Sequence, residues 1–215
     1  MSRSAVILCD GAFPRKAYPR YLLESADVAV CCDGALLKWL RHFGEGHLPD
    51  AVVGDMDSLP ETVQQRYSHL TVKIDEQDYN DLVKAMRYLL ENYPEVEQVH
   101  IIGATGKRED HTVGNLGLLM EFPRLLPLGD RLVDMVSDYG TAFVVTDSCS
   151  LHLGEGRRVS LFSADNSLRV KSKGLHWPTD DVVFDAWWKA TLNRTDAPVI
   201  ELEFSRPSSL LVMLD

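Results

Sequence analysis

Val28-Ala29-Val30-Cys31-Cys32-Asp33-Gly34-Ala35 is the stretch that decides the fold. An uninterrupted apolar run ends abruptly at Asp-Gly and is followed by residues that suit a helix. Such a run is typical of a strand in a parallel sheet that is covered on both faces. Comparable runs occur at residues 5–9, 51–53, 70–74 and 99–102.

Helical patterns separate these runs. The clearest covers residues 82–93, where apolar side chains recur at helical spacing. Alternation of strands and helices predicts an α/β domain with a doubly wound, mostly parallel sheet. We assign residues 1–128 to this domain.

The pattern changes near residues 123–130. Beyond this point, short apolar runs are punctuated by Gly, Asn, Asp and Pro, and helical periodicity is weak. This predicts an all-β, sandwich-like domain over residues 129–215. Its expected strands are 132–137, 142–146, 159–162, 168–170, 199–204 and 210–214.

Composition excludes several classes of protein. The formal charge is 22 − 32 = −10, which argues against a nucleic-acid binder, because such proteins carry clustered basic residues. Apolar residues make up 45% and charged residues 25%, as in ordinary globular proteins. The sequence contains no apolar stretch of ~18 residues, the length that a membrane-spanning helix needs. The apolar run at residues 5–8 is too short for a signal peptide, so we expect a cytoplasmic protein.

The four cysteines are Cys9, Cys31, Cys32 and Cys149. None forms a Cys-x-x-Cys pair, and three lie inside apolar runs, where cysteine is usually a small buried hydrophobic residue. We therefore expect neither a zinc site nor a disulfide framework.

Acidic residues follow the predicted parallel strands. In open α/β sheets, ligands bind outside the carboxyl ends of the strands. Asp and Gly are also common turn residues, but their recurrence after every strand favours a shared site. The stretches concerned are Cys9-Asp10-Gly11, Cys32-Asp33-Gly34, Gly54-Asp55-Met56-Asp57-Ser58, Asp75-Glu76-Gln77-Asp78 and the segment 103–110.

The positions of three further aspartates at the starts of predicted helices also indicate a site at the carboxyl edge of the sheet. Asp78 and Asp81 each lie four residues before an apolar position of the 82–93 helix, and Asp110 lies three before Val113. Each would continue a buried stripe toward the crevice, although helix capping or a solvated position is the alternative. Asp55 and Asp57 are two residues apart, so in an extended segment they face the same way.

Electrostatics indicates what such a cluster needs. Two carboxylates ~5 Å apart at an effective dielectric of ~20 repel by about 3 kcal/mol. Several of them require protons or cations. Oxygen ligands without clustered Cys or His select Mg²⁺ before Zn²⁺, and Mg²⁺ in such sites is usually completed by substrate phosphates. The crevice is thus predicted to be a metal–polyphosphate site.

The segment 103–110 supplies cationic and backbone groups for phosphate. Gly103, Gly106, Lys107 and Arg108 lie between a strand and a helix start, where backbone N–H groups favour an anion. The two basic residues could also be plain surface charge. The segment is not a Walker A loop, and no Gly-x-Gly-x-x-Gly occurs, which disfavours a dinucleotide oxidoreductase. Asp55-Met56-Asp57 follows the third strand, which disfavours a haloacid-dehalogenase-type nucleophile.

Four stretches in order resemble the motifs of the thiamine pyrophosphokinase family. They are Asp33-Gly34-Ala35, Gly54-Asp55-Met56-Asp57-Ser58, Glu76-Gln77-Asp78-Tyr79-Asn80-Asp81 and Gly103-Ala104-Thr105-Gly106-Lys107-Arg108-Glu109-Asp110-His111. Fainter matches follow at Gly174-Leu175-His176-Trp177-Pro178 and Ala190-Thr191-Leu192-Asn193.

The resemblance implies that diphosphate passes from ATP to the hydroxyethyl oxygen of thiamine, giving thiamine diphosphate and AMP. It implies that residues 1–128 form a catalytic domain that binds ATP and Mg²⁺, and that residues 129–215 form a domain for thiamine binding and dimerisation. It also implies a homodimer with sites between subunits. By motif position, the Mg²⁺ ligands are Asp55, Asp57, Asp81 and Asp110, which with Arg108 form the catalytic set. The ATP contacts are Asp33, Gln77, Asn80, Lys107 and Arg108. The thiamine contacts are Trp177, Thr191 and Asn193.

The chain departs from the family pattern in places. Glu76 and Asn80 replace the more usual Asp and Thr, and Leu192 stands where a Ser often helps to hold thiamine. Residues 206–212 lack the Trp that some members stack on the pyrimidine. Trp177, Trp187 or Trp188 could take that role by ring stacking on the cation, or could belong to the β-domain core or the dimer interface.

Phosphoryl-type transfer needs positioning and charge neutralisation rather than a protein nucleophile. His111 is expected on the helix surface, and Asp33 or Asp57 is the candidate general base. Two alternatives stay open at this point. One is a related diphosphokinase for another heterocyclic alcohol, such as a hydroxymethylpterin. The other is a non-catalytic sensor of Mg-nucleotide or thiamine diphosphate.

Overall fold

A computed structural model describes residues 2–215, which divide into two compact units. The first comprises the chain up to Leu118 together with Leu126–Asp138, and the second comprises Leu119–Leu125 and Tyr139–Asp215. Within residues 2–215, no helix combines the length and the apolar character that a bilayer crossing requires.

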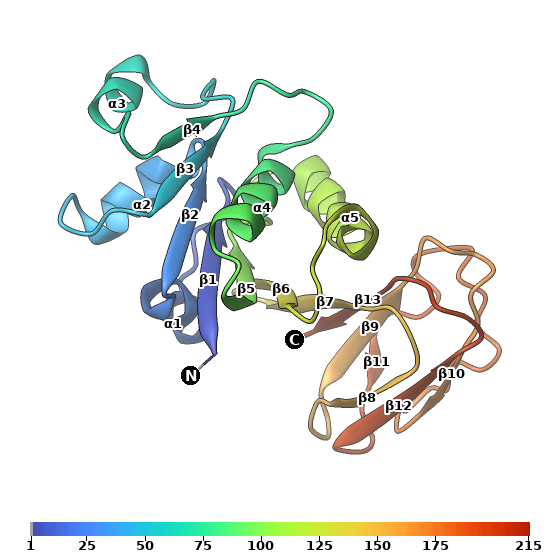
Figure 1. The fold of residues 1–215 in the computed structure, drawn as a ribbon. Helices are drawn as coiled ribbons and strands as arrows, with labels where there is room; N and C mark the ends of the chain where they lie inside the picture. Colours follow the sequence, from blue (N-terminus) through green and yellow to red (C-terminus); the bar gives the residue numbers. More distant parts are fainter. Residues whose placement is uncertain (1) are drawn as a thin grey trace. The chain divides into compact units, whose positions relative to one another are not determined.

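The first unit is built on six parallel strands in the order β6-β5-β1-β2-β3-β4 (Figure 1). The strands are β1 (Arg3–Leu8), β2 (Val28–Cys32), β3 (Ala51–Gly54), β4 (Thr71–Lys73), β5 (Val96–Ile102) and β6 (Leu132–Ser137). The helices are α1 (Ala17–Ser25), α2 (Ala35–Phe43), α3 (Glu61–Arg66), α4 (Asp81–Asn92) and α5 (Glu109–Leu125), of which α5 continues into the second unit from Leu119.

Helices cover both faces of this sheet. Trp39 and Leu36 of α2 and Leu23 of α1 share one apolar core with Val6 and Cys31 of the sheet. α4 packs against the central strands from the other face, as Figure 1 shows. The central strands are buried throughout, as continuous apolar runs require. The predicted doubly wound, mostly parallel architecture is confirmed.

The assignment of residues 132–137 to the antiparallel domain is wrong. β6 pairs in parallel with β5, with Gln98 opposite Leu132 and Ile102 opposite Val136. β5, α5 and β6 thus form a further strand–helix–strand unit, and a parallel connection of this kind needs the intervening helix. The boundary proposed at residue 128 separates α5 from the strand that follows it.

The second unit contains two antiparallel sheets around one core. The strand orders are β11-β9-β13-β7 and β10-β12-β8. The strands are β7 (Gly140–Val145), β8 (Cys149–His152), β9 (Arg158–Phe162), β10 (Val170–Lys173), β11 (Asn193–Arg194), β12 (Val199–Phe204) and β13 (Leu210–Leu214). Alternate residues of both sheets, such as Leu161, Val212, Ile200 and Leu202, are buried together. This is the predicted sandwich-like arrangement.

Candidate functional site

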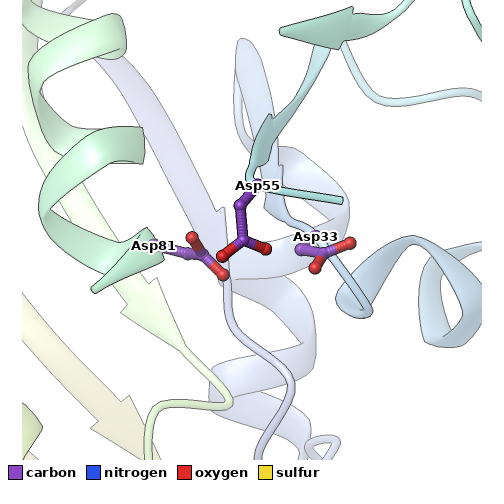
Figure 2. Close-up of side chains that lie close together, drawn as sticks. All are labelled: Asp33, Asp55 and Asp81. Carbon is purple, nitrogen blue, oxygen red and sulfur yellow. The ribbon is translucent and has the colours of Figure 1, made fainter. Parts of the chain in front are cut away.

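Three aspartates converge where the parallel strands end (Figure 2). Asp33 follows β2, Asp55 follows β3, and Asp81 opens α4. One carboxylate oxygen from each lies within 4.8 Å of the others. We call these three residues the carboxylate cluster. Sheet topology creates it, because the carboxyl ends of parallel strands share one edge.

Gly54 allows the cluster to be this tight. A Cβ at this position would lie 2.8 Å from the Cβ of Asp33 and 3.1 Å from the Cγ of Asp81. Contacts that short would force one of the two aspartates to move. The last residue of β3 must therefore lack a side chain.

Asp33 is the most buried member of the cluster. Its Oδ2 accepts a hydrogen bond of 3.0 Å from the backbone N–H of Ser58. Its Oδ1 is buried and has no hydrogen-bond partner among residues 2–215. Desolvation by burial, with the neighbouring carboxylates, raises the pKa of Asp33 to about 6, although the Ser58 N–H opposes the shift.

The other two members have different environments. Burial raises the pKa of Asp81, although the Lys84 ammonium 3.2 Å away opposes this. The backbone N–H of Asp57 donates to Asp55 and is the main cause of the lowered pKa of that carboxyl. The side-chain amide of Gln77 lies 3.5 Å from the Oδ2 of Asp55.

The carboxylate cluster fits a hard cation. All three potential ligands are oxygens, which Mg²⁺ prefers. Asp33 carries a buried oxygen that has no hydrogen-bond partner among residues 2–215, and such an atom normally requires a partner. The donor set and this orphaned oxygen together suit a divalent cation better than a purely structural role.

Asp57 and Asp110, predicted as metal ligands, lie outside this group of three. Asp57 is exposed and accepts a hydrogen bond from the Ser58 hydroxyl. The expectation of an extended Asp55–Asp57 segment is wrong, because Met56 adopts a left-handed conformation with φ 70° and turns the chain. Asp57 is still close enough to raise the pKa of Asp33.

Arg108 and Asp110 form an exposed ion pair of 2.5 Å at the start of α5. This pairing is the main cause of the lowered pKa of Asp110. The predicted buried stripe through Val113 is wrong, because Val113 is 53% exposed and Asn115 is buried instead. The helix is rotated so that the Asn115 amide donates to the carbonyl of Ala104. Asp78 is also exposed.

A cavity of about 360 Å³ adjoins the carboxylate cluster. Its size is that of a small-molecule site. Asp33 and Asp81 line it, together with Lys107 and Arg108 of the segment 103–110. Backbone hydrogen bonds from residues 11 and 12 to residues 103 and 105 fix this segment beside the end of β1.

Sequence reasoning listed Asp10 at the acidic edge but gave it no partner, and it missed Lys84. Asp10 bridges two lysines, with its oxygens 2.7 Å from Lys38 and 2.6 Å from Lys107. Lys84 is 3% exposed and pairs with Asp81. Its position inside the 82–93 helix, three residues after an aspartate, was the available signal.

Asn80 and His111 also line the cavity. The Oδ1 of Asn80 caps α4 by accepting the Val83 N–H, and its amide donates to Asn115 at 2.9 Å. Asn80 thus joins the start of α4 to α5. His111, expected on the helix surface, is exposed but borders the cavity.

The predicted thiamine residues lie in the second unit. Asn193 is 5% exposed and accepts from the N–H of Trp177 at 3.1 Å, while its amide donates to the Trp177 carbonyl at 2.7 Å. Trp177 itself is 57% exposed. The Thr191 hydroxyl donates to the carbonyl of Trp188. Asn193 therefore fixes the backbone beneath an exposed indole.

Leu192, which departs from the family pattern in sequence, has an unusual backbone conformation. It is 81% exposed and has φ 59°, a conformation that branched side chains rarely adopt. Its N–H donates to the Ser160 hydroxyl. Trp187 and Trp188 are also exposed. These tryptophans lie outside the apolar core of the second unit.

Comparison with known proteins decides the family. A model described as thiamin pyrophosphokinase, catalytic domain, matches residues 19–126, and one described as thiamin pyrophosphokinase, substrate-binding domain, matches residues 140–208. The chain belongs to the thiamine pyrophosphokinase family. The resemblance noted from the ordered motifs is thereby confirmed.

Relatives and solved structures agree. Thiamine pyrophosphokinase 3 of Oryza sativa subsp. japonica is 32% identical over 203 residues, which cover 82% of this chain and 73% of the relative. Thiamine pyrophosphokinase 1 of the same plant is 28% identical, with coverages of 82% and 74%. The Bacillus subtilis thiamine pyrophosphokinase structure superposes with a TM-score of 0.74 at 18% identity, covering 99% of this chain and 98% of the other. The Bacillus subtilis structure thus has the fold of this chain.

Proposed function

We propose that the protein is a thiamine diphosphokinase, which transfers a diphosphate group from ATP to the hydroxyethyl oxygen of thiamine and releases AMP. Membership of the thiamine pyrophosphokinase family over both units carries this conclusion. The cavity beside the carboxylate cluster supports it, because acidic and basic groups that suit a metal-bound polyphosphate line one space.

In this proposal, Asp33, Asp55 and Asp81 hold Mg²⁺ through carboxylate oxygens. Bound there, Mg²⁺ neutralises charge on the phosphates of ATP. Lys84 balances part of the charge of the cluster when the cation is absent. Asp57 and Asp110, the other ligands inferred from the family motifs, are kept as candidates that join when substrate is present.

Lys107 and Arg108 contact the phosphates. Both side chains are exposed at the cavity and end in charged donors, which form strong hydrogen bonds to phosphate oxygens. Arg108 stabilises charge that develops on the transferred group. Gln77 orients Asp55, and Asn80 holds the start of α4 beside the nucleotide.

We assign thiamine binding to Trp177, Thr191 and Asn193 of the second unit. The exposed indole of Trp177 offers a face for the cationic substrate, and Asn193 fixes its backbone. As the family resemblance implies, we propose a homodimer with active sites between subunits. Light scattering after size exclusion tests this, and a monomer at every concentration would contradict it.

The activity is tested with purified protein, Mg-ATP and thiamine. We expect AMP and thiamine diphosphate in equal amounts, and loss of both products on chelation of the metal. Hydroxymethylpterin in place of thiamine should give no AMP. ATP binding without AMP formation from thiamine would contradict the proposal. It would favour the alternative of a non-catalytic sensor. Family membership favours neither that alternative nor another heterocyclic alcohol.

A further inference from the structure

Cys9 and Cys32 bring two thiols together at the carboxyl ends of neighbouring strands. Cys9 directly follows β1, and Cys32 is the last residue of β2. Their Sγ atoms lie 3.8 Å apart, and both side chains are buried. The proposed reaction uses neither sulfur.

The strand register explains this contact and shows that a bond between the sulfurs can form. Leu8 pairs with Cys31 in the parallel β1–β2 ladder, so Cys9 is next to Cys32. Neighbouring strands lie about 4.8 Å apart, and a disulfide joins Cα atoms about 4.4–6.8 Å apart. The sulfurs need to approach by only about 1.8 Å to reach bonding distance.

Cys31 faces the other way. Successive side chains of a strand point to opposite faces, and Cys31 packs in the apolar core with Leu36 and Trp39. Cys9 and Cys32, by contrast, both line the cavity beside the carboxylate cluster. A small oxidant that enters the cavity therefore meets a pair of thiols, which a fully enclosed core would not offer.

We propose that Cys9 and Cys32 form a reversible disulfide, a redox modification site at the base of the cavity. A hydroperoxide oxidises one thiol to a sulfenic acid and is itself reduced to an alcohol, or to water if it is hydrogen peroxide. The second sulfur then displaces the sulfenic hydroxyl as water, forming the S–S bond. A dithiol reverses the bond by exchange. The disulfide is inferred from the geometry of the two thiols and does not depend on the proposed function.

The disulfide changes the cavity directly. Asp10 follows Cys9 and Asp33 follows Cys32. Drawing the two sulfurs together shifts the backbone that carries the partner of Lys107 and one member of the carboxylate cluster. If the proposed function is correct, oxidation lowers activity at least tenfold, and reduction restores it.

The test exposes the reduced, metal-free, full-length protein to hydrogen peroxide, blocks remaining thiols with iodoacetamide and maps the peptides by mass spectrometry. We expect loss of two hydrogens, two of the four cysteines unlabelled, and a linked peptide joining residues 9 and 32 that dithiothreitol cleaves. Cys31→Ala and Cys149→Ala should still form the link, whereas Cys9→Ala and Cys32→Ala should not.

A bond that joins Cys32 to Cys31, or no bond in the wild-type protein, would overturn the proposal. If Cys9→Ala does not fold, the wild-type peptide map decides alone. Activity is followed in parallel, with each variant compared with its own untreated rate. A protein that forms the link but makes no thiamine diphosphate would support the disulfide and refute the proposed function. Failure of one proposal can therefore be told from failure of the other.

Discussion

The ammonium group of Lys84 lies 3.2 Å from the Oδ1 of Asp81, one turn earlier on α4, and its side chain is almost wholly buried. A buried lysine is costly unless it is paired. Here it is paired with a member of the carboxylate cluster, so it offsets part of the repulsion among three neighbouring acids.

Lys84→Met should therefore destabilise the metal-free protein by about 1–3 kcal/mol, since it leaves a half-buried carboxylate unpaired. A cation should compensate, so that added Mg²⁺ raises the melting temperature more in the variant than in the wild type. Thermal unfolding with and without Mg²⁺ measures this. Lys73→Met, which removes an exposed ion pair with Asp75, is the control. Equal Mg²⁺ shifts in both variants would contradict the prediction.

Asp55→Asn and Asp81→Asn should each lower kcat/KM for thiamine diphosphate formation by about 100-fold or more, because each removes a charged group that stabilises the transition state through the cation. Asp57→Asn, made in parallel, measures whether that exposed residue joins the site during turnover. Circular dichroism confirms that the variants fold, and Asp75→Asn is the exposed control. Near-normal turnover in Asp55→Asn and Asp81→Asn would refute the metal-binding scheme.

Asp33 should make the stability of the metal-free protein depend on pH. Its folded pKa is raised from 3.8 to about 6, so the folded state binds the proton more tightly than the unfolded state. The resulting stabilisation is complete below pH 3.8 and is lost as pH rises through about 6. Asp33→Asn should remove this dependence and be more stable than the wild type above pH 6. Denaturant unfolding between pH 4 and pH 7 measures both effects. If the unfolding free energies of the two proteins change in parallel with pH, the raised pKa of Asp33 is excluded.

Lys107→Met should raise the KM for ATP about tenfold or more and leave the KM for thiamine nearly unchanged, since a charged hydrogen bond is worth roughly 1.5–3 kcal/mol. Lys107 is paired with Asp10, and a phosphate group would compete with that carboxylate. Lys171→Met removes an exposed ion pair of the second unit and serves as control. An unchanged KM for ATP would mean that Lys107 is plain surface charge.

Trp177→Ala and Asn193→Ala should have different effects. Trp177 is exposed, so its truncation should raise the KM for thiamine with little loss of stability. Asn193 makes two partly buried hydrogen bonds to the backbone of Trp177, so its loss should cost about 1–3 kcal/mol of unfolding free energy and raise that KM as well. Trp188→Ala is the matched exposed control; if it alone weakens thiamine binding, Trp188 is the stacking residue.

Much of the fold could be predicted from the sequence because buried parallel strands have a simple signature. The run at residues 28–32 has no polar residue at all, and β2 is buried throughout. The strand at residues 132–137 was assigned to the wrong sheet because it follows the change of pattern near residues 123–130. In the structure Asp134 pairs with His100 of the neighbouring β5 at 2.8 Å, which a local pattern does not reveal.

The acidic edge could be predicted, but its membership only in part. Asp55 and Asp81 were among the predicted ligands and lie in the cluster, whereas Asp33 was predicted as an ATP contact. Asp57 is separated by the turn at Met56, and methionine gives no local signal for a positive φ. The phase of α5 was wrong because Asn115 is buried through a hydrogen bond, whereas hydrophobic periodicity counts only apolar residues.

Gly54 carries no functional group, yet it governs how closely two functional groups approach. The spacing of the aspartates thus depends on a backbone position that has no side chain. Exchanging one acid for another leaves that spacing intact. The methyl group of an alanine at residue 54 would instead push Asp33 and Asp81 apart, although all three carboxylates would still be present. In the proposed Mg²⁺ site, the choice of ion would therefore depend on a residue that supplies no ligand atom.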